Sequence, residues 1–317
     1  MKILVVMNTR PHHRDWLAAS APGKEITYRS VDRLSEDDVR EAEVVIGNLP
    51  PRLLPAATRL RWLQLNTAGA DAYCQPGVLP PGTVLTNATG AYGLALSEHM
   101  LGQLLAMMKK LYLYYDNQRR CLWRDEGPVT SVAGAVVLIV GLGDVGTAFA
   151  RLVKAMGAHV IGIRRRPSAP PPEVDEMAPI EQLDGCLARA DIVAAALPGT
   201  PATRHLFDAG RFAAMKEHAY FLNIGRGFSV VSEDLAAAVG SGHLAGAAVD
   251  VTEPEPLPPD HPLWKVPNLY ITPHISGQNH LAATTDNIVR IAAGNLANYL
   301  AGHPLRNEVD FATGYRK

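Results

Sequence analysis

The sequence has few of the features that mark secreted, membrane or redox-active proteins. Its three cysteines, Cys74, Cys121 and Cys186, are widely spaced and form no CxxC pair, which fits a reducing cytosol better than a disulfide framework. No apolar run reaches the roughly 18 residues that a membrane span needs. The first residues, MKILVVMNTR, are too short an apolar run for a signal-peptide core and predict a β-strand. We therefore expect a cytoplasmic protein without a membrane partner.

An excess of charge of one sign is also absent. Lys and Arg number 30 against 31 Asp and Glu, for a formal net charge of -1. Nucleic-acid-binding domains usually have a basic face, so this balance gives no reason to expect a nucleic-acid partner. With 317 residues, the chain is long enough for two domains that each bury a full core.

The most informative stretch that is present is residues 135–152, AVVLIVGLGDVGTAFARL. Its apolar run predicts a strand buried on both faces of a parallel sheet, followed by a glycine-rich turn and a helix. Glycines in this order allow a tight turn, close approach of a pyrophosphate and close helix packing. A turn without a ligand is the alternative, but the required order of strand, turn and helix favours a dinucleotide site. The candidate contacts are Gly141, Gly143, Asp144, Val145 and Gly146.

The residues after the next predicted strand, 158–163, bear on the choice of cofactor. An NAD site usually carries an acidic residue about 20 residues beyond the glycines, but this chain has Arg164 and Arg165 there. A guanidinium can pair with the 2′-phosphate of NADP through two parallel hydrogen bonds. A solvated basic loop is the competing interpretation. We expect NADP(H), with NAD(H) as the alternative, and a cofactor-site rim formed by the proline-rich residues 167–172.

The order of predicted elements indicates two α/β domains. Strands are predicted at 3–7, 43–46, 62–65 and 84–85, and later at 192–197, 220–224, 245–251 and 269–272. A long helix over 97–120 separates the two groups, and its broad apolar surface predicts burial in a core or at a subunit interface. We expect two Rossmann-like or flavodoxin-like parallel-sheet domains. A cofactor domain, 97–282, is inserted in a substrate domain formed by 1–96 and 283–317.

Three residues whose side chains could bind or catalyse follow successive strands of the predicted cofactor domain. Arg226 lies in NIGRG, Glu255 in VTEPEPLP and His274 in TPHIS. Because ligands bind at the carboxyl ends of the strands in open α/β sheets, we expect these side chains to lie at one edge. His12 and His13 have no further ligands at metal-site spacing, so we expect a solvated loop there and no metal.

Several long motifs now support a resemblance to a known family. They include LQLNTAGADAY, SEHMLGQLLAMMKKL, GLGDVG, ALPGTPATRHLF, MKEHAYFLNIGRG, AAVDVTEPEPLP and LYITPHISG. Over nearly its whole length the chain resembles the D-isomer-specific 2-hydroxyacid dehydrogenases. The resemblance implies an oxidoreductase that transfers a hydride from NADPH, or NADH, to a 2-oxo acid and forms a D-2-hydroxy acid. It also supports a homodimer.

The resemblance assigns roles to the three candidate residues, and their chemistry agrees with those roles. Arg226 would bind the substrate carboxylate, which a forked guanidinium suits. His274 would give a proton to the developing alkoxide, and Glu255 would favour the charged form of that histidine. Glu253 is the competing acid in the same segment.

Further contacts follow from the same resemblance. The backbone amides of Ala68, Gly69 and Ala70 would hold the substrate carboxylate, with a plain turn as the alternative. Pro198 and Thr203 would lie near the nucleotide, and Asp250 would hold the nicotinamide carboxamide. A nucleotide-sensing corepressor or scaffold of the same fold is the alternative function. Formate dehydrogenases are disfavoured, because they pair the histidine with glutamine and this chain has an acid at 255.

Overall fold

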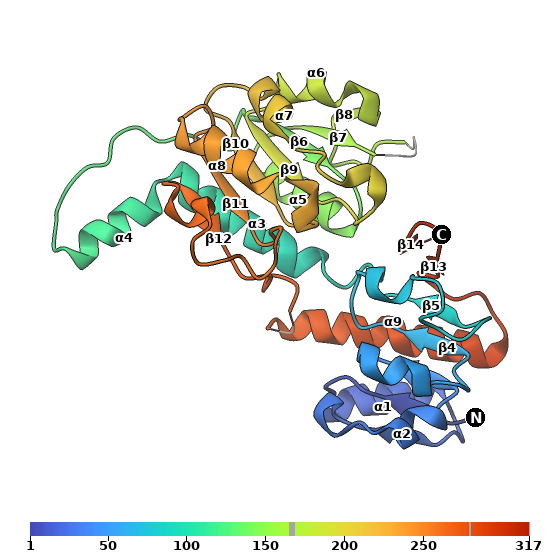
Figure 1. Cartoon of the computed structure of the whole chain (residues 1–317). Coiled ribbons are helices and arrows are strands. Elements are labelled where there is room, and N and C mark those ends of the chain that lie inside the picture. Colours follow the sequence, from blue (N-terminus) through green and yellow to red (C-terminus); the bar gives the residue numbers. More distant parts are fainter. Residues whose placement is uncertain (165–168, 279, 317) are drawn as a thin grey trace. The chain divides into compact units, whose positions relative to one another are not determined.

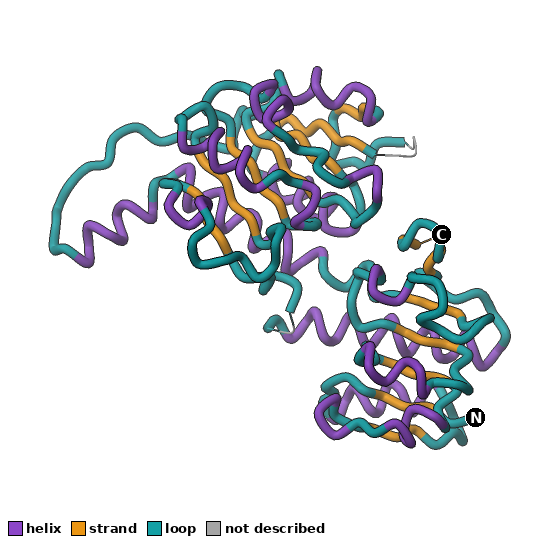
Figure 2. Tube along the Cα trace, viewed as in Figure 1, coloured by secondary structure: helices purple, strands orange, loops and turns teal. Residues whose placement is uncertain are grey.

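The computed structural model describes residues 1–164, 169–278 and 280–316, and the chain forms two compact units (Figure 1). Unit 1 comprises Met1–Tyr92 and Asn279–Lys317, and unit 2 comprises Gly93–Gln278. Each unit contains its own parallel sheet with helices around it (Figure 2). The predicted fold class, two parallel-sheet α/β domains, is thereby confirmed. Arg165, a predicted cofactor contact, lies outside the described residues.

Unit 1 is built on a five-stranded parallel sheet in the order β2-β1-β3-β4-β5. Four of its strands coincide with apolar runs of the sequence, whereas β2, whose three residues are only half-buried, was not predicted. The strands are β1 (Ile3–Val5), β2 (Ile26–Tyr28), β3 (Val44–Ile46), β4 (Trp62–Gln64) and β5 (Val84–Thr86). The remaining elements are α1 (Pro11–Ser20), α2 (Glu36–Arg40), α9 (Ala282–Ala301), β13 (Val309–Asp310), β14 (Tyr315–Arg316) and the 3₁₀ turns η1 (Val31–Arg33), η2 (Pro51–Ala56) and η3 (Asp71–Tyr73).

A buried polar network attaches the C-terminal helix α9 to the sheet of unit 1. The amide of Asn295 donates to the side-chain oxygen of Gln64 at 2.8 Å and accepts from the backbone N–H of Arg306 at 2.7 Å. Trp62 stacks on Tyr299 of the same helix, with ring centroids 5.0 Å apart. These bonds satisfy polar groups inside the core. They explain why a helix remote in sequence belongs to the N-terminal unit.

Unit 2 contains a seven-stranded parallel sheet in the order β12-β11-β10-β9-β6-β7-β8. The chain runs outward in both directions from the neighbouring strands β6 and β9, so the topological switch point lies between their carboxyl ends. The strands are β6 (Val136–Val140), β7 (His159–Ile163), β8 (Glu176–Ala178), β9 (Ile192–Ala195), β10 (Tyr220–Asn223), β11 (Gly246–Val249) and β12 (Leu269–Ile271). The short edge strand β8 was not predicted from the sequence.

Helices of unit 2 cover both faces of this sheet, and a buried apolar cluster lies on each side. They are α3 (Gly93–Met108), α4 (Leu111–Arg119), α5 (Asp144–Ala155), α6 (Leu183–Leu187), α7 (Ala209–Ala214) and α8 (Ser232–Gly240), with the 3₁₀ turns η4 (Ile180–Gln182), η5 (Pro201–Thr203), η6 (Gly227–Ser229) and η7 (Pro262–Lys265). Within the described ranges of the chain, no helix is both long enough and apolar enough to cross a lipid bilayer.

The prediction of one continuous helix over 97–120 was wrong. The chain forms α3 and α4 with a break at Lys110, whose φ of 54° lies in the left-handed region. The ammonium of Lys110 donates to the backbone oxygen of Glu126 at 2.6 Å. Helix α3 buries an apolar face, whereas α4 buries only Asn117 and extends away from the body of unit 2 (Figure 1). The apolar pattern continued across the break and concealed it.

Candidate active site

The glycine-rich turn after β6 has the close packing that its sequence predicts. Gly141 has a φ of +106°, and a Cβ there would lie 2.5 Å from the backbone oxygen of Ala196, just beyond β9. A Cβ on Gly146 would lie 2.1 Å from the oxygen of Gly141. Gly143 is the N-cap of α5, whose first amides have no intrahelical acceptor. The turn thus presents backbone donors at a helix N-terminus, which is an arrangement suited to a diphosphate.

Backbone and side-chain hydrogen bonds around this turn also fix its borders. The N–H of Gly141 donates to the oxygen of Ile163 at 3.0 Å, so Arg164 directly follows a residue bonded to the turn. The Asp144 carboxylate accepts a hydrogen bond, 2.9 Å long, from the N–H of Gly93, which is the first residue of α3. Val145, the next residue, packs against the buried cluster of this face.

The loop after β9 contains the predicted contacts Pro198 and Thr203. The Thr203 hydroxyl donates to the oxygen of Pro198 at 2.8 Å and accepts from the N–H of Thr200 at 3.0 Å. These bonds close the loop on itself beside the switch point. Thr203 therefore fixes the shape of this border through its own side chain.

Arg226 lies on a tightly enclosed turn after β10. A Cβ on Gly225 would lie 2.6 Å from the backbone of the loop after β9, and a Cβ on Gly227 would lie 1.9 Å from the backbone that follows β11. Only glycine fits at either position. The Asn223 amide donates to the oxygen of Arg226 at 3.1 Å, and the Ser229 hydroxyl donates to the same oxygen at 2.7 Å. The backbone that carries the guanidinium is thereby held in place.

A single buried carboxylate organises the loop after β12. Asp250, 2% exposed, accepts from the Thr272 hydroxyl at 2.6 Å, from the N–H groups of Ile275 and Ser276 at 3.0 and 3.2 Å, and from the Ser276 hydroxyl. Its backbone oxygen accepts from the N–H of His274 at 2.8 Å. His274 has a φ of 51°, which a residue other than glycine adopts only when its surroundings hold it there.

The structure distinguishes the two acids that the sequence left open. Nδ1 of His274 lies 2.6 Å from Oε1 of Glu255, and their side chains are 49% and 43% exposed. Glu253 instead accepts from Arg204 at 2.9 Å and contacts His205 at 3.0 Å. A carboxylate on Nδ1 assigns a proton to that nitrogen. Nε2 of His274 has no hydrogen-bond partner among the residues described, so it is available to a ligand.

In unit 1, the loop Asn66–Ala70 turns its carbonyls toward the protein. The oxygen of Ala68 accepts from the Asn87 amide at 2.8 Å, and that of Gly69 accepts from the Thr67 hydroxyl at 2.9 Å. The N–H groups of Ala68, Gly69 and Ala70 find no acceptor within residues 1–164, 169–278 and 280–316. Successive amides without acceptors form a concavity suited to an anion such as a carboxylate.

Sequence reasoning missed the asparagine pair that supports this loop. Each backbone N–H donates to the other's side-chain oxygen: Asn48 to Asn66 at 2.8 Å, and Asn66 to Asn48 at 3.1 Å. The Asn48 amide also donates to the Thr67 hydroxyl at 3.2 Å. Both asparagines stand two residues beyond the ends of β3 and β4. This equal spacing was the available signal, because neighbouring parallel strands place such residues side by side.

The prediction that His12 and His13 lie in a solvated loop was wrong. His13 is fully buried in α1, and its Nε2 lies 2.8 Å from the carboxylate of Asp286, with His12 at 3.3 Å. The hydrogen bond from His13 and a second from His12 lower the pKa of Asp286. The three groups lie close enough to surround an ion. However, Nδ1 of His13 accepts from the N–H of Arg10 at 3.1 Å, so its Nε2 carries a proton rather than a lone pair.

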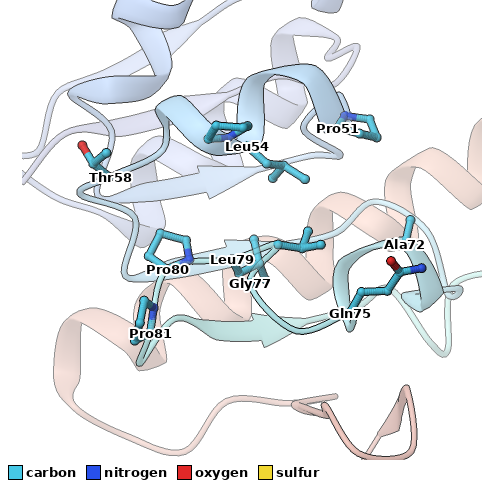
Figure 3. A pocket seen from close by; sticks show the side chains of 11 residues that line it. Pro51, Leu54, Thr58, Ala72, Gln75, Gly77, Leu79, Pro80 and Pro81 are labelled. Atoms are coloured by element: carbon cyan, nitrogen blue, oxygen red, sulfur yellow. The ribbon is translucent and has the colours of Figure 1, made fainter.

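An open pocket of about 870 Å³ also lies in unit 1, between η2 and the segment that leads to β5 (Figure 3). It contains none of the predicted site residues. Its lining is Pro51, Leu54, Pro55, Thr58, Ala72, Gln75, Gly77, Val78, Leu79, Pro80 and Pro81.

Comparison with known proteins identifies the family of the chain. Residues 101–276 match the family model described as D-isomer specific 2-hydroxyacid dehydrogenase, NAD binding domain. A glyoxylate reductase/hydroxypyruvate reductase of Mus musculus is 30% identical over 325 residues, which cover 98% of this chain and 98% of the relative.

Solved structures extend the similarity to the whole chain. A D-isomer specific 2-hydroxyacid dehydrogenase family protein from Aeromonas salmonicida is 33% identical with a TM-score of 0.86, covering 98% of this chain and 99% of that one. An NADPH-dependent glyoxylate/hydroxypyruvate reductase from Sinorhizobium meliloti, solved with NADP and sulfate, is 28% identical with a TM-score of 0.83 and 99% coverage of both chains. The family model spans more than half of the 317 residues, and the chain belongs to the D-isomer specific 2-hydroxyacid dehydrogenase family.

Proposed function

We propose that this protein reduces a 2-oxo acid to a D-2-hydroxy acid with NADPH, and that His274 supplies the proton. The observation that carries the proposal is the 2.6 Å contact between His274 Nδ1 and Glu255. This contact lies in the same unit as the enclosed Arg226 turn and the dinucleotide turn. The three side chains follow β10, β11 and β12, which are neighbours in the sheet.

Each residue has a defined task in this reaction. The guanidinium of Arg226 pairs with the substrate carboxylate through parallel hydrogen bonds and draws electron density from the adjacent carbonyl. The amides of Ala68, Gly69 and Ala70 in unit 1, which find no acceptor among the described residues, are proposed as further donors to a substrate carboxylate. NADPH, when bound, supplies the hydride. The carbonyl oxygen then takes the proton from Nε2 of His274, while Glu255 stabilises the imidazolium before transfer.

The cofactor turn and its surroundings have separate tasks. The backbone amides at Gly143, Asp144 and Val145 are proposed to bind the diphosphate at the positive end of α5. The carboxylate of Asp250 serves mainly to hold the His274 loop, because four donors of that loop occupy it. Its contact with the nicotinamide carboxamide remains part of the proposal.

The alternative, a nucleotide-sensing corepressor or scaffold, would need the cofactor turn but not an acid–base pair. A panel of glyoxylate, hydroxypyruvate, pyruvate and longer 2-oxo acids, each with NADPH and with NADH, separates the two functions. Loss of nicotinamide absorbance that depends on the 2-oxo acid supports the reductase. NADPH binding without turnover on any of these acids would favour the scaffold.

The two glutamates provide a matched test of the acid–base pair. Glu255→Gln is expected to lower kcat by about 10- to 100-fold, because the imidazolium loses its charged partner. Glu253→Gln removes an acid only two residues away that contacts Arg204 and His205 instead. We expect its kcat to stay within about threefold of the parent value. Steady-state NADPH oxidation measures both, and equal losses would contradict the assignment of Glu255.

Cofactor preference is proposed to depend on Arg164, at the end of β7 beside the dinucleotide turn. Arg164→Asp replaces a partner of the 2′-phosphate by a charge that repels it, so the ratio of kcat/KM with NADPH to that with NADH should fall at least about tenfold. Arg52→Asp makes the same charge change at an exposed position of unit 1 and should leave the ratio unchanged. If Arg164→Asp keeps the parent ratio, the preference has another origin.

We also propose a homodimer that uses the segment from α4 to residue 129. Six large apolar side chains there are exposed, and Trp123 is exposed to 105%. They are Leu111, Tyr114, Tyr115, Leu122, Trp123 and Val129. An apolar arm of this kind is costly in water and typical of an interface. Trp123→Ser should raise the dimer dissociation constant in sedimentation equilibrium at least about tenfold. Val31→Ser, at an exposed residue of unit 1, is the control and should leave the dimer dissociation constant unchanged. An unchanged dissociation constant for Trp123→Ser would refute dimerisation through this segment.

A further inference from the structure

A contact from helix α3 reaches the loop that carries His274. Nε2 of His99 lies 3.1 Å from the Thr272 hydroxyl, and the Gln103 amide lies 3.4 Å from the same oxygen. Both residues are half-buried. The Thr272 hydroxyl in turn donates to the Asp250 carboxylate at 2.6 Å. His99, Thr272 and Asp250 thus form a continuous chain of hydrogen bonds that ends on the carboxylate organising the catalytic loop.

The direction of these bonds follows from the groups involved. An ionised carboxylate only accepts, so the single hydroxyl proton of Thr272 is committed to Asp250. His99 must therefore donate from Nε2 to the lone pairs of the hydroxyl. This donation polarises the hydroxyl and strengthens its bond to Asp250. His99 was not among the site residues predicted from the sequence.

We propose that His99 is a positioning residue for His274, acting through Thr272 and Asp250; this proposal rests on the proposed reductase function. Among the described residues, His99 forms no hydrogen bond or ion pair with Arg226, Glu255 or His274, so its proposed effect on the reaction passes through the loop. Four bonds hold the loop residues Ile275, Ser276 and His274 to Asp250. Loss of the His99 bond leaves the Thr272 hydroxyl with only the longer donation from Gln103 at 3.4 Å. Its bond to Asp250 is then weaker, and the orientation of Asp250 becomes less defined.

The placement of His99 on α3 gives the contact a rigid base. Helix α3 is 16 residues long, and Met100, Leu104 and Met107 are buried in the core of unit 2. Its first residue, Gly93, donates to Asp144 at the start of α5. The dinucleotide turn and the His274 loop are therefore both hydrogen-bonded to one buried helix.

Substitutions at His99 test this role. His99→Leu removes the donor at similar size, and we expect kcat to fall about tenfold, with the KM for the 2-oxo acid and the NADPH dissociation constant within about twofold. His99→Gln places an amide N–H near the position of Nε2 and should restore at least half of the parent kcat. Glu98→Gln, an exposed neighbour on the same helix, is the control and should match the parent.

A double-mutant cycle distinguishes positioning from a general loss of stability. If His99 acts through Thr272, His99→Leu should cause less than about a twofold further loss of kcat in a Thr272→Val background. A further tenfold loss in that background would overturn the proposal, as would a His99→Leu variant with the parent kcat.

Amide hydrogen exchange provides a readout that does not require activity. We expect the N–H groups of Ile275 and Ser276 to exchange at least about fivefold faster in His99→Leu and at the parent rate in His99→Gln. If the parent enzyme proves inactive on all 2-oxo acids but the exchange differs as expected, the proposed function fails and the positioning role stands. Unchanged exchange in His99→Leu refutes the positioning role, whatever the activity of the parent.

Discussion

His274→Ala is expected to lower kcat for NADPH-dependent 2-oxo acid reduction by about 1,000-fold, within the range that a positioned general acid contributes. The imidazole is the group whose Nε2 is open to a ligand while its Nδ1 is held by Glu255. Without it, the alkoxide must take its proton from water. Steady-state rates measured at saturating NADPH and substrate provide kcat.

Two controls make this result specific. The NADPH dissociation constant from fluorescence titration should stay within about twofold, because the variant removes no group of the dinucleotide turn. His280→Ala changes an exposed histidine six positions further on and should retain the parent kcat. A His274→Ala enzyme with kcat within about tenfold of the parent would contradict the role of His274 as the acid.

Arg226→Ala is expected to reduce kcat/KM for the 2-oxo acid by about 1,000-fold, the value for two lost hydrogen bonds to a charged group. Arg226→Lys should recover only part of this loss, because an ammonium is a point charge without the fork of the guanidinium. Circular dichroism would confirm that both variants fold, and NADPH binding should be retained. If Arg226→Ala keeps normal kcat/KM, the substrate carboxylate binds elsewhere.

Much of the fold was predictable because its signals are local. The apolar run 136–140 and the spacing of Gly141, Gly143 and Gly146 specify strand, turn and helix within one short stretch, and the structure has β6 and α5 there. The predicted edge was visible for a similar reason. Arg226, Glu255 and His274 each follow an apolar strand, and parallel strands bring their carboxyl ends to one side of the sheet.

Features that depend on distant residues could not be predicted in this way. The burial of His13 depends on Asp286, 273 residues later in the chain. Local pattern alone did not separate Glu255 from Glu253, because each precedes a proline in the same irregular loop. The preference for Glu255 came from the family resemblance. The helix break at Lys110 lies within a continuous helical sequence pattern. It accompanies a hydrogen bond from Lys110 to Glu126, 16 residues later, which the local pattern does not show.

Three of the residues predicted to contact the cofactor use their side chains to bond within the protein. Asp144, Thr203 and Asp250 use their side chains within the protein, on Gly93, on Pro198 and on the His274 loop. Their types were recognisable from sequence, but hydrogen-bond partners follow from tertiary packing. In each case the side chain shapes the site.

The most direct test of the central claim is the configuration of the product. The enzyme is incubated with NADPH and hydroxypyruvate or pyruvate, and the isomers of the 2-hydroxy acid formed are separated by chiral chromatography. Their total amount is compared with the amount of NADPH consumed. We expect one hydroxy acid per NADPH oxidised, all of it the D-isomer. An L-product, a racemic product or NADPH loss without a hydroxy acid would contradict it.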